Sequence, residues 1–523
     1  MGRFAYGFDK IRILKFIPYY CTKQYFPYQF SIILVLNTFI IMIRKFKSLF
    51  VAAACIAIAV MCYTSCTFNN TSSAASEIKP MVLPAPERPT GQADVINLTT
   101  PKLETVRVGF IGLGMRGPGA VERFTHLEGV KIVALCDIHS DRVEKSQNIL
   151  KKAGLPEAIA YSRNEDAWKQ LCERDDIDLV YIATDWKNHT PMAVYAMEHG
   201  KHAACEVPIA ISVDECWQLV NASEKTRKHC IMLENCCYDF YEMTTLNMAQ
   251  HGLLGEIVHA EGAYIHDLRS LNFMNPEKGG YNDWWRLKMN EEHTGNYYPT
   301  HGLGPVAQAL NIGRGDRMEY LVSVSSDQFG MTAYAKDKFG ADSEFAKQTY
   351  ALGDMNNTII KTAKGKTILI QHDVTSPRPY NRKHALSGTK GYIEKYPRPG
   401  IALDPSEVAS AKFDNLAAHS FVSKEIYDAL MEEYQHPITK EVGELAKKVG
   451  GHGGMDFIMD YRLVYCLHNG LPLDMNVYDG AEWSCLGELT ELSVKNNGAP
   501  IAVPDFTRGG WNKIQGFKHA FVE

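Results

Sequence analysis

The feature that most constrains the fold is a glycine pattern between an apolar strand and a helix. Residues 106–111 (Val-Arg-Val-Gly-Phe-Ile) have the character of a buried strand, and Gly112, Gly114 and Gly117 follow with GxGxxG spacing. In such a turn the first glycine makes the bend, the second lets backbone approach a pyrophosphate, and the third allows close helix–strand packing. Amides at the helix N-terminus then face the phosphates. The motif therefore predicts a dinucleotide site.

A carboxylate at the end of the next strand indicates which dinucleotide binds. Asp137 closes the apolar stretch 130–137, about 20 residues beyond the glycines, where an acidic side chain binds the ribose hydroxyls. The same charge would repel a 2′-phosphate. We therefore expect NAD as the cofactor in preference to NADP.

Strands and helices alternate after the glycine motif and stop alternating near residue 240. The expected strands are 106–111, 130–137, 179–184 and 202–205, and the expected helices are 117–125, 142–153, 191–199 and 213–227. Alternation at this spacing predicts a doubly wound parallel sheet, so the fold class is α/β with an N-terminal Rossmann domain over 105–238.

The remainder, 239–523, follows a different pattern. Strands are expected at 257–265, 320–326, 358–362, 367–373 and 391–395, with a hairpin turn on Gly365. Consecutive strands with short turns favour a mostly antiparallel sheet, so we expect a substrate-binding domain of α+β type. A broad sheet face of this kind also favours a homodimer.

The N-terminus reads as an export signal. Positive charges at 44–47 precede an apolar run, Leu49 to Met61, and small residues precede Cys66; this order is typical of a signal peptide. The cysteine resembles the acylated residue of lipoproteins, although a signal peptide with an incidental cysteine is the alternative. We expect 1–66 to be an export region, of which 1–41 lies upstream of a plausible start at Met42. Residues 67–104 are expected to be a linker, and the protein to be a periplasmic or outer-membrane (cell-surface) lipoprotein.

Composition narrows the class of partner. The chain has 523 residues, which favours several domains, and a net charge of −5 without a long charged run. This balance argues against nucleic acid, and membrane contact is expected only through the lipid anchor. The 13 cysteines show no metal-type CxxC pairs, so we expect no metal and interpret most of them as small buried apolar residues.

Two runs resemble a known oxidoreductase family. The runs 107–117 and 133–137 are similar to the family of glucose–fructose oxidoreductase and inositol dehydrogenase, in which the fourth strand ends in Glu-Lys-Pro. Here the matching residues are Glu206, Val207 and Pro208. The resemblance implies that the catalytic lysine, which assists removal of a hydroxyl proton, is replaced by Val207. This replacement argues against a simple sugar dehydrogenase.

Further motifs narrow the resemblance. Trp186-Lys-Asn-His189, Tyr298-Pro-Thr-His301, the glycine-rich run 450–456 and the run 504–509 together resemble glycoside hydrolase family 109, the NAD-dependent α-N-acetylgalactosaminidases. The resemblance extends from about Val106 to the C-terminus. It implies a glycan substrate with a terminal α-N-acetylgalactosamine or a related α-glycoside.

The resemblance also implies a set of site residues. NAD would contact Met115, Arg116, Asp137, Trp186, Lys187, Asn188, His189, Glu206, Val207, Asn235 and Tyr298, beside the glycines. The sugar would contact Tyr264, Arg286, Tyr298, Pro299, Thr300, His301 and Tyr380. His452, in the glycine-rich loop, would border the active site.

The chemistry implied for this family needs groups that exchange protons near neutral pH. The sugar is oxidised at C3, the C2 proton is lost, the glycosidic oxygen leaves C1, water adds, and the hydride returns. NAD-dependent glycosidases are exceptions to the two-carboxylate pattern, and no such pair stands out here. Histidine suits these proton transfers. We hypothesise that Tyr298 and His301 act at C3 and C2, and that His452, on a mobile loop, protonates the leaving oxygen.

Alternatives stay open for these residues and for the chain as a whole. His301 would instead be a buried structural residue, His452 a turn residue, and Tyr281, Trp284 and Trp285 fillers of the sheet–helix interface. For the chain as a whole, one alternative is a sugar dehydrogenase that releases NADH. The other is a sugar-binding lipoprotein with a vestigial cofactor. The intact glycine motif and the motif-borne histidines argue against the last reading.

Overall fold

The computed structural model describes residues 79–405, 412–414 and 416–522. The expected export region 1–66, with Cys66, lies outside the described residues, as does the first part of the expected linker. Within the described ranges, no helix is both long enough and apolar enough to cross a membrane.

The N-terminal half is a six-stranded sheet, all of it parallel, in the order β3-β2-β1-β4-β5-β6. Its strands are β1 (Val106–Ile111), β2 (Val130–Cys136), β3 (Ile159–Tyr161), β4 (Leu179–Ile182), β5 (His202–Cys205) and β6 (Cys230–Met232). Its helices are α3 (Gly117–Phe124), α4 (Ser140–Lys152), α5 (Ala167–Cys172), α6 (Trp186–Glu198) and α7 (Val213–Thr226). This is the doubly wound order, whose direction reverses between β1 and β4, and ligands bind outside the carboxyl ends of the strands there. The predicted Rossmann fold is confirmed.

The second sheet has eight strands in the order β13-β12-β11-β7-β10-β9-β8-β14. The strands are β7 (Ile257–Ile265), β8 (Met318–Ser325), β9 (Asn356–Thr362), β10 (Thr367–Asp373), β11 (Ala385–Gly388), β12 (Gly391–Glu394), β13 (Gly400–Leu403) and β14 (Ile501–Ala502). All neighbouring pairs are antiparallel except β7 and β10. The expected hairpin joins β9 to β10, and Gly365 has φ +87° there, a conformation that favours glycine.

The described chain after β6 also contains helical segments, some of which pack on this sheet and others on the Rossmann domain. They are η1 (Asn235–Tyr238), α8 (Phe240–Gln250), α9 (Arg269–Asn272), η2 (Pro276–Lys278), η3 (Asn282–Trp284), α10 (Trp285–Glu292), α11 (Thr300–Ala309), α12 (Gly330–Phe339), α13 (Glu344–Lys347), α15 (Lys424–Glu433), α16 (Pro437–Val449), η4 (His452–Gly454), α17 (Met455–Asn469), α18 (Val477–Ser484), α19 (Leu486–Lys495) and η5 (Gly510–Asn512). Helix α11 packs on β7 and β10, and α19 packs on β8. Because α11 begins with residues of the Tyr298–His301 motif, this packing fixes that motif against the sheet.

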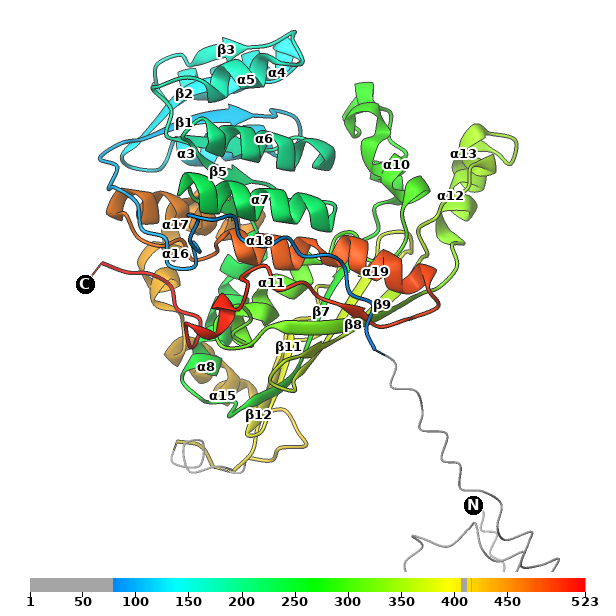
Figure 1. Ribbon diagram of the computed structural model, residues 1–523. Helices are drawn as coiled ribbons and strands as arrows, with labels where there is room; N and C mark the ends of the chain where they lie inside the picture. Colours follow the sequence, from blue (N-terminus) through cyan, green and yellow to red (C-terminus); the bar gives the residue numbers. More distant parts are fainter. Residues whose placement is uncertain (1–78, 406–411, 415, 523) are drawn as a thin grey trace, which may run out of the picture. The chain divides into compact units, whose positions relative to one another are not determined.

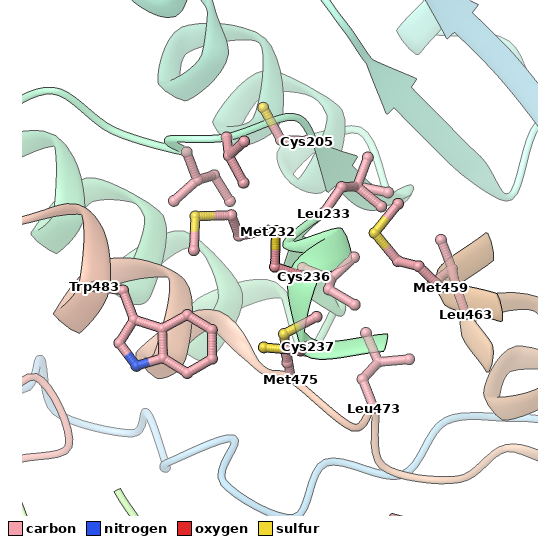
Figure 2. Close-up of a cluster of buried hydrophobic side chains, with 14 of the residues drawn as sticks. Cys205, Met232, Leu233, Cys236, Cys237, Met459, Leu463, Leu473, Met475 and Trp483 are labelled. Carbon is pink, nitrogen blue, oxygen red and sulfur yellow. The ribbon is translucent and has the colours of Figure 1, made fainter. Parts of the chain in front are cut away.

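The chain returns to the Rossmann sheet near its C-terminus. Helix α18 packs along α7 and against β6, and α17 contacts α3 and β1 (Figure 1). Residues 455–484 therefore lie against the N-terminal domain, although the expected boundary at residue 239 assigns them to the second. Figure 2 shows the core beneath this junction, where Trp483 faces a group of methionines and cysteines. Nine cysteines of the described chain are free and buried, as interpreted from the sequence.

The described part of the expected linker, 79–104, is packed on the domains. Met81 bridges to Ile501, and the side chains of Val95, Ile96 and Leu98 are buried. Arg88 forms an ion pair with the buried carboxylate of Glu224 at 2.9 Å. The sequence did not predict this packing, because the stretch is mostly polar. Its few apolar residues also follow neither a helical nor a strand period.

Candidate cofactor and sugar site

A groove at the carboxyl ends of the parallel strands fits a dinucleotide. A cavity of about 380 Å³ is lined by the glycine turn, Asp137 and residues of the second domain, among them Tyr281 and Trp285. A Cβ on Gly112 would lie 2.6 Å from the backbone of Ala183, and one on Gly117 would lie 2.0 Å from the Gly112 oxygen. Gly112 and Gly117 therefore serve the turn and the helix packing, while Gly114 lines the cavity and leaves its backbone open to a pyrophosphate.

Asp137, the carboxylate expected to bind the ribose, follows β2 directly and lines the groove. Its Oδ2 accepts from the Leu113 amide at 2.8 Å and its Oδ1 from the His139 amide at 2.9 Å. Arg142 lies 3.7 Å from the same carboxylate and also lines the cavity. The carboxylate thus both secures the glycine turn and faces the cavity, beside a cation that the sequence reasoning did not include.

The Trp186–His189 segment is the first turn of α6 and not a loop. Asn188 lines the cavity, and its Nδ2 donates to Asp185 at 2.8 Å. Lys187 is exposed and 3.9 Å from Glu292. The ring of His189 is buried, with its nitrogens 2.7 Å from the Pro208 oxygen and 3.2 Å from the Thr184 oxygen. Burial lowers the pKa of His189. The imidazole contacts backbone oxygens in the segments that follow β4 and β5, so it holds these two segments together.

A side chain from the segment after β5 contacts one from the glycine turn. Arg116 donates through Nε to Glu206 at 3.1 Å and is partly exposed at the groove, as is Met115. Val207 is buried and precedes a cis peptide bond to Pro208. A buried apolar side chain thus follows Glu206 directly, at the position where the resemblance implied a replaced lysine.

Aromatic rings enclose a buried guanidinium beside the groove. The guanidinium carbon of Arg286 lies 4.8 Å from the Tyr298 ring centre and 5.0 Å from that of Trp186, and the Tyr298 and Trp186 rings stack at 5.4 Å. Arg286 Nη1 donates to Tyr281 at 3.1 Å, whereas its Nε and Nη2 are buried with no partner among the described residues. Neighbouring Trp285 packs on Trp186. Buried donors without partners indicate room for an acceptor on a ligand.

Tyr298 and His301 meet as predicted, and a third residue completes the arrangement. The Tyr298 hydroxyl lies 3.2 Å from His301 Nε2, and His301 Nδ1 lies 2.7 Å from Glu234 Oε1. Burial by itself would raise the pKa of Glu234, but the adjacent His301 outweighs it and the pKa is lowered, so the carboxylate is ionised. Burial raises the pKa of Tyr298 well above its ordinary value. A buried carboxylate, an imidazole and a neutral phenol therefore form a line along which a proton can move.

Glu234 was not predicted from the sequence, where its only signal is its place directly before Asn235.

Pro299 is the N-cap residue of α11, and Thr300 is wholly buried beside it. The other expected sugar contacts lie next to this line. Tyr264 packs 4.7 Å from the Tyr298 ring, and its hydroxyl lies 2.9 Å from His266 Nδ1. Tyr380, half exposed, lies 5.0 Å from the His266 ring. His266 was also missed.

His452 is joined to the cofactor side of the site. Its Nδ1 lies 2.9 Å from Asp456 Oδ2 and 3.2 Å from an Arg116 nitrogen. Asn235, an expected NAD contact, is buried and donates to Asp456 Oδ1 at 2.6 Å. The structure therefore brings His452 together with Arg116 and Asn235, through an aspartate to which the sequence gave no role.

A metal-like grouping occurs next to His301 and is chemically unsuited to a cation. Ligand atoms of Glu234, Cys236 and His301 lie within 4.8 Å of one another. The Arg382 guanidinium lies 2.7 Å from the Cys236 sulfur, and burial raises the pKa of that thiol well above its ordinary value. A protonated thiol beside a fixed positive charge is a poor ligand.

Comparisons with known proteins agree with this geometry. Residues 106–234 match the family described as "Oxidoreductase family, NAD-binding Rossmann fold", and residues 238–513 match "Glycosyl hydrolase 109, C-terminal domain". Among solved structures, levoglucosan dehydrogenase in complex with NADH and levoglucosan is similar in fold, with a TM-score of 0.57 at 17% identity. That similarity covers 77% of this chain and 100% of the dehydrogenase.

Sequence relatives are much closer. "Glycosyl hydrolase family 109 protein 1" of Bacteroides fragilis is 58% identical over 460 residues, which is 87% of this chain and 97% of the relative. "Alpha-N-acetylgalactosaminidase" of Bacteroides fragilis is 56% identical over 422 residues, which is 81% of this chain and 96% of the relative. With an NAD-binding Rossmann domain joined to the domain characteristic of these enzymes, the chain belongs to glycoside hydrolase family 109.

Proposed function

We propose that the protein hydrolyses glycans with a terminal α-N-acetylgalactosamine, using NAD as a cofactor that is regenerated in each turnover. The observation that carries the proposal is the Glu234–His301–Tyr298 line, which lies beside the buried Arg286 and next to the NAD groove. The relative named α-N-acetylgalactosaminidase supports the choice of sugar.

The glycine turn and Asp137 would hold NAD, which would supply reversible hydride transfer at C3 of the sugar. The protein's own residues handle the protons. Tyr298 and His301 take the proton from the C3 hydroxyl and then from C2, and Glu234 stabilises the charge that His301 gains. His452 protonates the glycosidic oxygen as it leaves C1. Water then adds its hydroxyl to C1 and gives its other proton to His452, which restores that residue. A proton returns to C2, and another returns to the C3 oxygen as the hydride returns to C3.

Arg286 is placed to hold the substrate. Its buried Nε and Nη2 lack acceptors in the described chain, and a carbonyl oxygen such as that of the acetamido group would satisfy them. The surrounding rings of Trp186, Tyr298 and Tyr264 offer apolar faces for the sugar ring. Together these groups favour an N-acetylated sugar.

A panel of chromogenic α- and β-linked glycosides, supplied to the purified holoenzyme, tests this function. We expect release from the α-N-acetylgalactosaminide without net formation of NADH. Free oxidised sugar accompanied by NADH in excess of enzyme would identify a sugar dehydrogenase instead, and tightly held NAD without turnover of any glycoside would identify a binding protein.

We further propose that the protein is exported as a lipoprotein acylated on Cys66, at the periplasmic or outer-membrane surface. The support is the order of positive charges, apolar run and small residues before Cys66. Mass spectrometry of the mature N-terminus tests this. An unlipidated start near Ser72 or later contradicts it.

We also propose a homodimer formed through the open face of the eight-stranded sheet. Val324 and Ile359 are 59% and 57% exposed, and the strand register sets Val322 and Leu369 beside Ile359 on the same face. Apolar side chains gathered on one exposed face favour burial against a partner. Light scattering of wild type and an I359E/V324E variant tests it; a monomeric wild type contradicts it.

A further inference from the structure

The glycine-rich loop holds His452 in a backbone conformation that only glycine adopts readily. Residues 450 to 454 have consecutive positive φ angles of +93°, +83°, +47°, +75° and +110°. The four glycines take these angles without penalty, whereas His452 does so at a cost. The conformation therefore requires contacts that favour it over the alternatives.

The contacts of the loop converge on Asp456. A Cβ on Gly451 would lie 2.7 Å from the Asp456 Cβ, so the loop backbone rests directly on this side chain. The Gly451 oxygen accepts from the Gly454 amide at 2.9 Å and from the Asp456 amide at 3.3 Å. The His452 ring then reaches Asp456 Oδ2 at 2.9 Å. The His452 side chain is itself 55% exposed, so this bond is its main restraint.

The two carboxylate oxygens of Asp456 serve different parts of the site. Oδ2 faces His452 and lies 3.3 Å from Arg116, whereas Oδ1 accepts from Asn235 at 2.6 Å. Arg123 lies 3.5 Å from Oδ2. Asp456 is 1% exposed, and although burial would raise its pKa, His452, Arg116 and Arg123 together hold the pKa below its ordinary value. The carboxylate is thus ionised and fully engaged.

We infer that Asp456 is a positioning residue that holds the His452 loop in place and couples its position to the cofactor side of the site through Asn235 and Arg116. One rigid carboxylate bridges both groups, so freeing the loop loosens the cofactor contacts, and loss of the cofactor contacts loosens the loop. The role given to His452 in turnover rests on the proposed function, whereas the coupling does not.

Three variants separate the links. Asp456→Asn removes the charge and leaves one acceptor oxygen where His452 and Asn235 now use two. His452→Ala breaks only the exposed end of the link and should fold normally. Asp460→Asn is the matched control, because Asp460 lies one turn further along α17 and accepts from Arg123 at 2.6 Å. Among the described residues it makes no hydrogen bond to the loop or to Asn235. Thermal melts verify folding.

Two measurements on the holoenzymes need no turnover. Hydrogen exchange at the amides of residues 450–456 reports the loop, and displacement of bound NAD by excess NADH, followed by fluorescence, reports the cofactor. We expect both rates to rise about tenfold in D456N and in H452A, as expected for loss of one charge-assisted hydrogen bond, and to stay within about twofold in D460N.

Several results would overturn the inference. Unchanged loop exchange in D456N, or in H452A if D456N does not fold, contradicts the positioning role. If H452A exchanges its loop amides faster but releases NAD at the wild-type rate, the coupling is contradicted. If D460N raises both rates as much as D456N does, the effect comes from loss of a buried charge in general. In turnover of an aryl α-N-acetylgalactosaminide, we also expect D456N to lower kcat with KM within about twofold. Failure of turnover in wild type refutes the proposed function while leaving the exchange measurements interpretable.

Discussion

Replacing Glu234 by Gln tests whether the buried carboxylate assists His301. The Glu234 Oε1 lies 2.7 Å from His301 Nδ1, so the charge centres are about 4 Å apart when the ring is protonated. Opposite unit charges at about 4 Å interact with about 4 kcal/mol at an effective dielectric constant of about 20. The glutamine oxygen still accepts a hydrogen bond, so we expect about half of this stabilisation to be lost from the charged intermediate states.

A loss of about 2 kcal/mol corresponds to a fall in kcat of about 30-fold. The assay is hydrolysis of an aryl α-N-acetylgalactosaminide by the holoenzyme at pH 7. Bound NAD should be retained, because Glu234 lines neither the glycine turn nor the ribose end. Glu482→Gln is a control for the substitution itself, since Glu482 is a buried carboxyl group that accepts from the Met318 amide away from the sugar site. A kcat for E234Q within threefold of wild type would refute the reasoning.

The remaining predictions address the cofactor, the protons and stability. Asp137→Ser should relax the preference for NAD over NADP, because Arg142 then offers a cation to the 2′-phosphate; NADP binding should fall again in a variant that also carries Arg142→Ala, as judged by fluorescence titration of the reduced cofactors. Cleavage in D₂O should place deuterium at C2 of the released sugar, read by mass spectrometry, provided that the proton exchanges; its absence with full turnover argues against C2 deprotonation. His301→Ala should lower kcat at least about 10²-fold in the glycoside assay while NAD stays bound. Burial raises the pKa of Glu482 to about 8, so its stabilisation of the fold is complete below about pH 4.5 and is lost as pH rises through about 8; the melting temperature of wild type should therefore fall more between pH 6 and 9 than that of E482Q.

Local sequence signals predicted the parts of the fold that depend on local chemistry. In the strand, glycine turn and helix at 106–124, the residues that set the backbone angles and allow close packing are neighbours in the sequence. The same holds for the hairpin at Gly365. The strands β3 and β6 were not predicted, because three residues are too few to show a period. Helix α6 begins at Trp186, five residues before the expected start at Pro191, so this proline lies inside the helix instead of at its start. Proline is disfavoured there, which is why the sequence pattern favoured a later start.

Most of the side chains that the structure brings together around Arg286 and the groove were expected from the sequence. The carboxylates that pair with them were not. Glu234 lies 67 residues from His301, and Asp456 lies 221 residues from Asn235. No short-range pattern records such pairs, because the first forms where α11 packs beside η1 and the second where α17 packs beside η1. Resemblance identified the histidines, and only the structure identified the carboxylates that orient them.

The physical reason for these missing partners gives a rule for reading similar chains. A buried ionised group is tolerated only when opposite charges or donors satisfy it, so a histidine or arginine expected in a closed site requires a carboxylate or a ligand from elsewhere in the fold. His301 has such a carboxylate in Glu234, whereas the largely exposed His452 pairs with Asp456 one helical turn along the chain. The buried guanidinium of Arg286 has no salt-bridge partner in the described chain, and its Nε and Nη2 make no hydrogen bond there. By the same rule, we expect a substrate to supply acceptor oxygens to this guanidinium.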